Sequence, residues 1–324
     1  MANVVALGEL LIDFTPYGKS DKSNDLYECN PGGAPCNVLA SVSKLGLSSS
    51  FIGMVGNDNF GHHLKNTLKK FNINSEGLIF SNKYRTTLAF VHLDNKGERS
   101  FTFFRNPGAD MMLTPEDVPL NIVKSANIFH FGGLSMTNES SKNAALLAAK
   151  TAKENGQLVS YDPNYRPLLW NSIKEAAKKM YDGLKYTDIL KVSHEEMEMF
   201  TGTNDLLNGS NVLYDIGIKL VLVTLAEKGC FYFYKNGYGQ LPTFAVNVVD
   251  TTASGDSFLG GVLYKIIKLN NFNISSIKNE EMKKIIEFAN AMGALTATKK
   301  GAIDSIPSFK EVTNCINHFS KNIL

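Results

Sequence analysis

Short apolar runs alternate with amphipathic stretches along most of this 324-residue chain, and this alternation restricts the possible folds more than any other feature. Short apolar runs predict buried strands, whereas apolar residues spaced three and four positions apart predict helices that cover a sheet. The expected strands are Val4–Leu7, Ser50–Val55, Asn127–Phe131, Leu158–Tyr161, Ile189–Val192 and Leu220–Thr224. The expected helices lie near residues 34–45, 60–71, 139–154, 172–183, 194–201, 257–269 and 281–299. Each strand except the last precedes a helical stretch, which favours parallel strands joined by crossover helices, and hence an α/β fold.

Three segments break this alternation and predict a small β-appendage. Arg85–Leu93 and Glu98–Arg105 alternate like strands, and the residues between them, Asp94-Asn95-Lys96-Gly97, suit a hairpin turn. The segment Asp13–Asn30 is polar and lacks helical spacing. Because no low-complexity linker separates these segments from the rest, we expect a single domain over residues 1–324. The appendage, formed by roughly residues 13–30 and 85–106, would be inserted in it.

The predicted hairpin has a face that suggests a role for the appendage. Phe101 and Phe103 share one face with Arg105 if the second strand alternates regularly. Aromatic side chains beside an arginine suit a lid over a ligand or a contact between two copies of the chain. An ordinary surface hairpin is the alternative. We favour a lid, which would also provide the interface of a homodimer.

The charge composition gives no sign of a nucleic-acid or membrane partner. Lys and Arg total 33 against 31 for Asp and Glu, so there is no global basic field. The N-terminus has no basic leader, and the chain has no run of ~18 consecutive apolar residues. The cysteines form no CxxC pair, which favours reduced thiols over a metal site; they are Cys29, Cys36, Cys230 and Cys315. We expect a cytoplasmic protein that acts on small molecules.

Several common catalytic motifs are absent or incomplete. Gly56-Asn-Asp-Asn-Phe-Gly61 has the glycine spacing of a P-loop, but His62 and His63 stand where Lys and Ser or Thr are required. We interpret this segment as a turn that caps the helix beginning near Phe60. The glycine fingerprint of a dinucleotide-binding fold does not follow the first strand, and HExxH and GxSxG are missing. A P-loop enzyme and a dehydrogenase are therefore unsupported.

The stretch Asp250-Thr-Thr-Ala-Ser-Gly-Asp-Ser-Phe258 places a carboxylate inside a turn that is suited to anions. Apolar residues after Asp256 recur at helical spacing, so the turn is the start of a helix. The outward-pointing amides of Ala253, Ser254, Gly255 and Asp256, together with the helix dipole, would bind an anion. Asp256 itself either caps the helix or serves a reaction. This stretch alone does not decide between the two.

A second segment favours the reaction. Asn30-Pro-Gly-Gly-Ala-Pro-Cys-Asn37 puts Gly32 and Gly33 at a strand-to-helix turn, and Asn37 one turn into the helix. The glycines let a ligand approach the backbone closely, and Asn37 offers a donor and an acceptor to hydroxyl groups. Asp13, after the first strand, adds a carboxylate of the kind that grips paired sugar hydroxyls. Each residue has an ordinary structural explanation, but together they indicate a sugar site.

At this point the chain resembles a known family. NPGGAPCNVLASVSKLG and DTTASGDSFLGG resemble the two signature segments of the ribokinase-like (PfkB-type) carbohydrate kinases. Further matching segments are Gly8–Asp13, Gly53–Asp58, Asp162–Arg166, Lys191–Glu196, Val223–Gly229 and Lys299–Ala302. Within the family, Arg85–Val91, Phe104–Asp110 and Ala289–Ala302 resemble the fructokinases. The resemblance implies a three-layer α/β/α sandwich with a mostly parallel central sheet and a small β-sheet lid.

The resemblance also implies catalytic roles. In this family an aspartate matching Asp256 takes the proton from the sugar hydroxyl, and amides matching Ala253, Ser254 and Gly255 form an anion hole. The commonest family form is Gly-Ala-Gly-Asp, whereas this chain reads Ala-Ser-Gly-Asp. Because Ala253 is not glycine, we expect no positive φ at that position. We interpret Ser254 as a small surface residue rather than a phosphate contact.

The family match assigns binding residues for each ligand. The sugar side is expected to comprise Asp13, Gly32, Gly33, Asn37, Phe101, Arg105 and Arg166, with a structural salt bridge as the alternative for Arg166. The ATP side is expected to comprise Lys191, Ser193, Thr224, Gly229 and Asn290. Glu196 matches the residue that organises Mg²⁺ through water. A monovalent cation, K⁺, would be held mostly by carbonyl oxygens at Asp250, Thr252, Thr296, Lys299, Gly301 and Ser305. On the nucleotide side two further residues depart from the family pattern, because Ser193 replaces an asparagine and Ala226 replaces a glycine.

The resemblance therefore predicts an ATP-dependent fructokinase that phosphorylates the 6-hydroxyl of D-fructose. A kinase for 2-keto-3-deoxygluconate, or for another sugar, is the first alternative, since Arg105 could serve a carboxylate substrate. A catalytically silent sugar-binding regulator is the second. A silent homologue has no requirement for the base, and this chain retains Asp256 with Gly255 beside it.

Overall fold

The computed structural model describes residues 2–93, 99–269 and 272–321, which form two sheets. The larger sheet has nine strands in the order β13-β12-β11-β10-β9-β8-β1-β4-β5. These strands are β1 (Val4–Leu7), β4 (Ser49–Gly56), β5 (Ile73–Ser81), β8 (Ile128–Gly132), β9 (Leu158–Asp162), β10 (Ile189–Ser193), β11 (Leu220–Thr224), β12 (Cys230–Tyr234) and β13 (Gly237–Leu241). Two neighbouring pairs at one side of the sheet, β11 with β12 and β12 with β13, are antiparallel, and the other pairs are parallel. The sheet is therefore mostly parallel, as expected.

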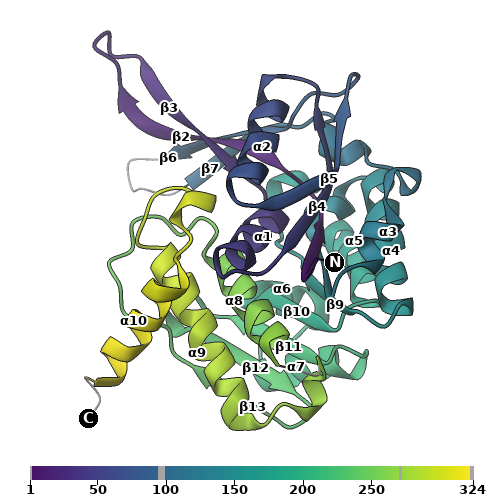
Figure 1. The fold of residues 1–324 in the computed structure, drawn as a ribbon, viewed down its shortest axis with the longest axis vertical. Coiled ribbons are helices and arrows are strands. Elements are labelled where there is room, and N and C mark those ends of the chain that lie inside the picture. The colour runs from purple at the N-terminus through teal and green to yellow at the C-terminus, as the bar shows by residue number, and fades with distance from the viewer. Residues whose placement is uncertain (1, 94–98, 270–271, 322–324) are drawn as a thin grey trace.

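Helices cover both faces of this sheet and make a three-layer sandwich (Figure 1). One layer consists of α1 (Ala34–Lys44), α2 (Asn59–Lys70), α8 (Ser254–Lys268), α9 (Asn279–Thr296) and α10 (Phe309–Lys321). The other consists of α3 (Leu120–Lys124), α4 (Glu139–Glu154), α5 (Ile173–Leu184), α6 (His194–Thr201) and α7 (Leu206–Asp215). The strands alternate between the two cores: in β1, Val4 and Ala6 face the first layer, whereas Val5 and Leu7 face the second. Burial on both faces explains why these strands are apolar runs.

The smaller sheet has the order β3-β2-β6-β7 and projects from one end of the molecule (Figure 1). Its strands are β2 (Leu11–Lys19), β3 (Asp25–Gly32), β6 (Leu88–Leu93) and β7 (Arg99–Phe104). The β-appendage predicted from the sequence is thus confirmed, although the turn expected at residues 94–97 lies outside the described residues. Among the described residues, no helix is both long and apolar enough to cross a membrane.

The six strands expected in the main sheet are all present, and the seven expected helices correspond to α1, α2, α4, α5, α6, α8 and α9. The turn between Gly56 and Gly61 caps α2 as expected, because Oδ1 of the N-cap residue Asp58 accepts the Gly61 amide at 2.9 Å. The sequence reasoning missed the strands β5, β12 and β13 and the helices α3, α7 and α10.

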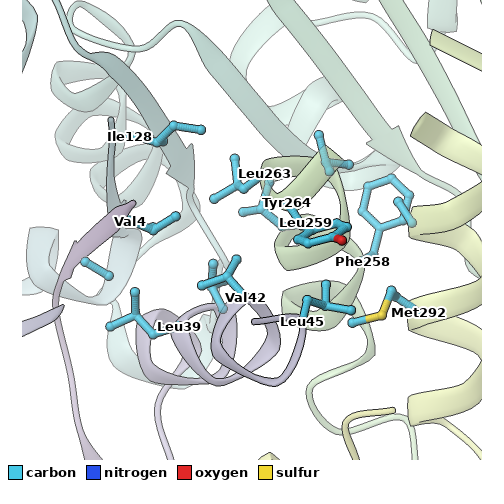
Figure 2. Packing of buried hydrophobic residues seen from close by; sticks show 14 of the residues in the cluster. Val4, Leu39, Val42, Leu45, Ile128, Phe258, Leu259, Leu263, Tyr264 and Met292 are labelled. Carbon is cyan, nitrogen blue, oxygen red and sulfur yellow. The ribbon is translucent and has the colours of Figure 1, made fainter. Parts of the chain in front are cut away.

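The packing of α1 against α8 forms the part of the core that positions the site (Figure 2). Leu39 and Val42 of α1 face Leu259 and Leu263 of α8 below the sheet. The two helices approach closely at Gly260, where an added Cβ would overlap Cβ of Ser41. Because α1 carries Asn37 and α8 carries Asp256, this contact fixes the separation of two candidate site residues.

We expect the variant Gly260→Ala to be destabilised by about 1–3 kcal/mol, since the new methyl group forces α8 away from α1. The free energy of unfolding, measured by denaturant titration, should fall accordingly. Adding Ser41→Gly removes the atom that the methyl group meets, so the double variant should recover part of the loss. A single variant as stable as the wild type would contradict the close contact between the helices.

Candidate active site

The turn that leads into α8 contains a left-handed residue. Ala253, the N-cap, has φ 61° and ψ 4°, so the expectation that this position avoids positive φ is wrong. The amide of Ser254 donates to the carbonyl of Thr251 at 3.2 Å and closes a four-residue turn. The third residue of this turn is Ala253, and its positive φ is the conformation that type II and type I′ turns have at this position. The chain geometry therefore overrides the ordinary preference of alanine.

The same turn also corrects the expected set of free amides. The Ser254 amide is already engaged by Thr251, whereas the amides of Ala253, Gly255 and Asp256 have no acceptor among the described residues. Three N–H groups, together with the positive end of the α8 dipole, remain available to an anion. Of the four amides expected from the turn, the Ser254 amide is therefore not available, and the amides of Ala253, Gly255 and Asp256 remain.

Asp256 does not cap the helix. It is the third residue of α8, and the N-cap Ala253 has no side-chain capping bond. Its Oδ2 atom accepts a hydrogen bond from Nδ2 of Asn37 at 2.8 Å, and both side chains are buried. Oδ1 of Asn37 is buried and has no hydrogen-bond partner in the described part of the chain. The helix-cap alternative is therefore wrong, and the two segments singled out in the sequence meet at this bond.

The surroundings of Asp256 favour a carboxylate that can gain a proton near neutral pH. Burial raises the pKa of Asp256 to about 6, and the nearby Asp162 carboxylate acts in the same direction. The hydrogen bond from Asn37 and the charges of Lys191 and Arg166 oppose this rise in the pKa. A general base is most effective when its pKa lies near the working pH.

Asp13, Gly32 and Gly33 lie beside Asp256 at the base of the smaller sheet. An added Cβ on Gly32 would overlap Oδ2 of Asp13, and one on Gly33 would overlap the carbonyl oxygen of Glu9. Gly33 also has φ 124°, which favours glycine. Burial raises the pKa of Asp13 to about 7, against the attraction of Arg166. Gly32 is therefore required by its packing against the Asp13 carboxylate, and Gly33 by its packing against the Glu9 backbone and by its positive φ.

The two arginines expected on the sugar side have different surroundings. Arg166 is exposed, and its charge lowers the pKa of both Asp13 and Asp256, so it lies near these carboxylates. Arg105 is buried instead, with an ion pair to Asp110 at 2.7 Å and hydrogen bonds to Thr137 and Leu134.

Most N–H donors of Arg105 are therefore occupied. The expectation of a sugar contact at Arg105 is not supported, because its guanidinium joins the base of β7 to the main domain.

Phe101 lies in β7, where its backbone pairs with Val91 of β6, but its side chain lies outside the described residues. Phe103, two residues on, is half-buried. Phe103 pairs with Ala89 of β6, so the two side chains lie on one face of the sheet. Ala89 in turn pairs with Asp13. Phe103 and the Asp13 carboxylate thus share one face of the smaller sheet.

A cleft of about 940 Å³ opens beside the first turn of α8. It includes Ser254 and Gly255 of that turn and the expected ATP residues Ser193, Thr224, Gly229 and Asn290. Its volume is that of a pocket for a ligand of nucleotide size. Its wall also includes the apolar residues Leu225, Phe244, Val246, Val248 and Phe258. The N-terminus of α8 therefore separates this cleft from the carboxylates around Asp256.

Ser254 differs from the expectation that it is a small surface residue. It lines the cleft, and its hydroxyl oxygen is buried without a hydrogen-bond partner among the described residues. Asn290 anchors the opposite wall, since its Nδ2 group donates to the carbonyls of Leu241 at 3.1 Å and Pro242 at 3.0 Å.

Lys191, expected in the ATP cleft, is not among the residues that line it. Its Nζ atom lies 3.0 Å from Oδ2 of Asp162 on the neighbouring strand, and both side chains are buried. An added Cβ on Gly255 would lie 3.1 Å from this Nζ, so the ammonium packs directly against the first turn of α8. Nearby carboxylates raise the pKa of Lys191 above its usual value despite the burial, so the ammonium stays charged.

Glu196, the expected magnesium residue, closes a capping box at the start of α6. Its Oε2 accepts the Ser193 amide at 2.7 Å, and its Oε1 accepts the Tyr165 amide at 2.5 Å. The described residues contain no cluster of three or more His, Cys, Asp or Glu side chains that could hold a metal directly. A magnesium ion at this position would therefore fit only through water and the phosphates of a nucleotide, the coordination that Mg²⁺ commonly adopts.

Asp250 holds together the two turns expected around a monovalent cation. Its Oδ1 accepts the amide of Thr252 at 2.8 Å, and its Oδ2 accepts that of Gly301 at 3.3 Å. Ser305 is buried in the same loop, whereas the Thr296 hydroxyl points into the α8–α9 packing, where it bonds Ser257. Lys299 forms an ion pair with Glu311. The side chains of Thr296 and Lys299 are thus engaged elsewhere, which leaves backbone carbonyls as the oxygen ligands that a cation would need here.

Three comparisons with known proteins agree with this geometry. The family model described as "pfkB family carbohydrate kinase" matches residues 1–308. The chain belongs to the pfkB family of carbohydrate kinases.

The pfkB-family relatives include several fructokinases. The chain is 44% identical over 309 residues to "Probable fructokinase-2" of Arabidopsis thaliana, covering 94% of this chain and 93% of that protein. It superposes with a TM-score of 0.90 on the ATP-bound fructokinase of Xylella fastidiosa, at 32% identity over 99% of this chain and 100% of the other. It also superposes on a double-mutant fructokinase of Vibrio cholerae O395, bound to fructose, ADP and a potassium ion. The TM-score is 0.86, at 32% identity over 98% of each chain.

Two residues that depart from the pfkB-family pattern keep a left-handed backbone. The family commonly has glycine at the positions of Ala253 and Ala226, and these alanines have φ 61° and 51°. Positive φ is uncommon for alanine but is sterically possible, whereas it is strongly disfavoured for β-branched residues. Both alanines of this chain therefore hold a backbone conformation that favours glycine.

We expect Ala253→Val to lower the free energy of unfolding by about 1–3 kcal/mol, because a β-branched residue is strained at positive φ. The strain would also shift the anion-binding amides and lower kcat. Ala253→Gly is the matched control and should keep wild-type activity. Unfolding titrations and turnover measurements check both variants, and equal behaviour of the valine and glycine variants would contradict a role for the left-handed turn.

Sequence reasoning assigned no role to two buried residues of this pfkB-family site. Glu9 follows β1, and its Oε1 accepts the Ala34 amide at 2.8 Å, which caps α1. Asp162 ends β9 and pairs with Lys191. Both lie at the carboxyl ends of parallel strands, where α/β proteins bind ligands. A polar residue directly after an apolar strand was the signal that could have identified them.

Proposed function

We propose that the protein transfers the γ-phosphate of ATP to the 6-hydroxyl of D-fructose. The observation that carries this proposal is the start of α8, where free amides face a nucleotide-sized cleft while Asp256 contacts Asn37 on the other side. A phosphoryl group and an acceptor hydroxyl can therefore meet at one helix N-terminus. The fructokinase relatives supply the substrate, since the chain covers nearly all of their length.

In the proposed reaction Asp256 accepts the proton of the sugar hydroxyl as its oxygen attacks the γ-phosphorus. The bond from phosphorus to the β-γ bridging oxygen breaks, and ADP leaves with that electron pair. The amides of Ala253, Gly255 and Asp256 stabilise the negative charge on the transferred group. Asn37 holds the carboxylate in position, and its free Oδ1 can accept a bond from the sugar.

The remaining sugar contacts are proposed at Asp13, Gly32, Gly33 and Arg166, with Phe103 of β7 on the same face of the sheet as Asp13. A carboxylate close to the Asp256 base suits neighbouring sugar hydroxyls, and the Arg166 charge suits the phosphate that is transferred. The adjacent sheet that carries Asp13 would serve as the lid. Closure of such a lid would exclude water from the transfer.

The nucleotide is proposed to lie in the cleft between Ser193, Thr224, Gly229 and Asn290. Glu196 would hold a magnesium ion through water, and its charge would help to neutralise the phosphates of ATP. The turns joined by Asp250 would hold K⁺ beside the anion-binding amides.

We also propose a homodimer through the outer face of the smaller sheet. Several apolar side chains on this sheet are exposed, among them Tyr17 at 69% and Phe104 at 61%. Phe90 stacks on Phe14 and contacts Tyr27 and Phe104 in an aromatic row. An apolar patch of this kind is typical of an interface. The cytoplasmic location stays a prediction.

A coupled assay of ADP release tests the proposed function, with fructose, 2-keto-3-deoxygluconate, ribose and adenosine as acceptors. We expect fructose to give the highest kcat/KM. Turnover of the keto acid without turnover of fructose would reject the substrate while leaving the kinase chemistry in place. Binding of fructose without any ADP release would favour the silent regulator.

A further inference from the structure

We propose that the hydroxyl group of Ser254 binds the phosphate chain of the nucleotide, by donating a hydrogen bond to an oxygen of the β- or γ-phosphate. This inference rests on the proposed function, because it adds a contact within the cleft that is proposed to hold ATP. The other contacts at the start of α8 come from the backbone amides of Ala253, Gly255 and Asp256. Ser254 would add a side chain to this set.

The place of Ser254 in the fold carries the first part of the argument. It is the first residue of α8 and lines the cleft together with Gly255. The amides on either side of it, those of Ala253 and Gly255, have no acceptor among the described residues and are available to an anion. A phosphate group bound by these amides would therefore lie beside the Ser254 side chain.

The missing partner of the hydroxyl carries the second part. The Oγ atom of Ser254 is buried and has no hydrogen-bond partner in the described part of the chain. Helix α9 packs against this residue at Gly293, where an added Cβ would lie 3.1 Å from the Ser254 carbonyl oxygen, and a glycine supplies no side-chain partner. Buried polar groups in folded proteins rarely lack a partner, and leaving one unsatisfied costs stability. The partner of this hydroxyl is therefore expected to arrive with a ligand.

A single torsion separates the buried hydroxyl from the cleft. Serine has one rotatable side-chain bond with three staggered positions. Ser254 is only partly buried as a residue, and it forms part of the cleft wall. Rotation about this bond would turn Oγ from the buried side toward the cleft. There the hydroxyl would donate to a charged phosphate oxygen, which makes a stronger bond than one between neutral groups.

The fold does not require a hydroxyl at this position. Alanine is the common residue here in the pfkB family, and it is also the best helix former. Ser257, one turn further along α8, is the opposite case. Its hydroxyl accepts from Oγ1 of Thr296 at 2.8 Å and donates to the carbonyl of Met292 at 3.4 Å. The two serines therefore make a matched pair for an experiment, one without a partner and one with two.

The test compares the wild type with Ser254→Ala and Ser257→Ala. Calorimetry gives the dissociation constants of a non-hydrolysable ATP analogue and of AMP, both with Mg²⁺ and without sugar. AMP lacks the β- and γ-phosphates. Ser254→Ala should weaken binding of the analogue by roughly 10- to 100-fold, the range for a hydrogen bond to a charged group, and leave AMP binding unchanged. Ser257→Ala should leave both dissociation constants unchanged.

The free energy of unfolding without nucleotide gives a second readout. Ser254→Ala removes a hydroxyl that has no partner, so this variant should be at least as stable as the wild type. Ser257→Ala removes a hydroxyl that has two partners, so it should be less stable. A purely structural role of Ser254 would give the reverse for its variant: lower stability, without a selective loss of affinity for the analogue.

Two results would overturn the proposal. If Ser254→Ala binds the ATP analogue as tightly as the wild type does, the hydroxyl makes no contact with the nucleotide. If AMP binding falls by the same factor, the hydroxyl does not contact the β- or γ-phosphate.

None of these measurements needs turnover of fructose. Failure of the wild type to phosphorylate fructose would reject the proposed substrate and leave this inference in place. Failure of the wild type to bind the ATP analogue would reject both. Equal affinities of the wild type and Ser254→Ala would reject this inference alone.

Discussion

Asp256→Asn should lower kcat with fructose and ATP by roughly 10²- to 10⁴-fold, the usual contribution of a general base. The amide cannot take the proton of the sugar hydroxyl, but it keeps the size of the carboxylate and can still accept the bond from Asn37. The anion-binding amides belong to the backbone and are unchanged. Affinities for ATP and fructose, measured by calorimetry, should therefore stay within a few-fold of the wild type.

Asp205→Asn is the matched control for this substitution. Asp205 is an exposed N-cap residue of α7 that is not among the residues lining the cleft, and asparagine caps helices as well as aspartate does. The control should keep full activity. Turnover by Asp256→Asn within tenfold of the wild type would remove Asp256 as the base.

Of the substitutions considered, Asp13→Ala should have the second largest effect, and it should weaken only the binding of the sugar. A carboxylate that accepts bonds from two hydroxyls contributes about 1.5–3 kcal/mol for each. Its loss should raise the KM for fructose by on the order of 10²-fold, while the KM for ATP changes little. Initial-rate kinetics with each substrate varied separately make the distinction.

Asp21→Ala provides the control for Asp13, because Asp21 is an exposed residue in the turn between β2 and β3 of the same sheet. It should leave both KM values unchanged. An Asp13 variant in which the KM values for ATP and fructose rise equally would indicate a general disturbance of the fold rather than a sugar contact.

The sequence allowed the buried parallel strands to be predicted because each is a continuous apolar run with both faces covered. Val4–Leu7 and Leu220–Thr224 were expected at the bounds that the structure has. The edge strands β5 and β13 were missed because Ile73–Ser81 contains Asn, Ser, Glu and Gly, and Gly237–Leu241 alternates glycine with exposed residues. Strands at an edge need fewer apolar residues, so their pattern is weak.

The candidate site was predictable where a residue's position along the chain decides its role, and unpredictable where tertiary contacts decide. Asn37 and Asp256 follow turns with recognisable glycines, and their contact matches the expectation that the two segments form one site.

The position of Lys191 depends on which partner reaches it across the sheet, which the sequence does not specify. The same applies to Arg105, whose guanidinium pairs with Asp110, and to Ala253, whose left-handed φ accompanies the turn bond from Ser254 to Thr251.

The most direct test of the central claim is NMR analysis of the product that the wild-type protein forms from ATP and ¹³C-labelled fructose. We predict one phosphorylated sugar whose phosphorus couples to carbon 6, formed in equal amount to ADP. A phosphate on another carbon would contradict the proposed placement of the 6-hydroxyl at Asp256, and ADP release without a sugar phosphate would contradict the proposed function.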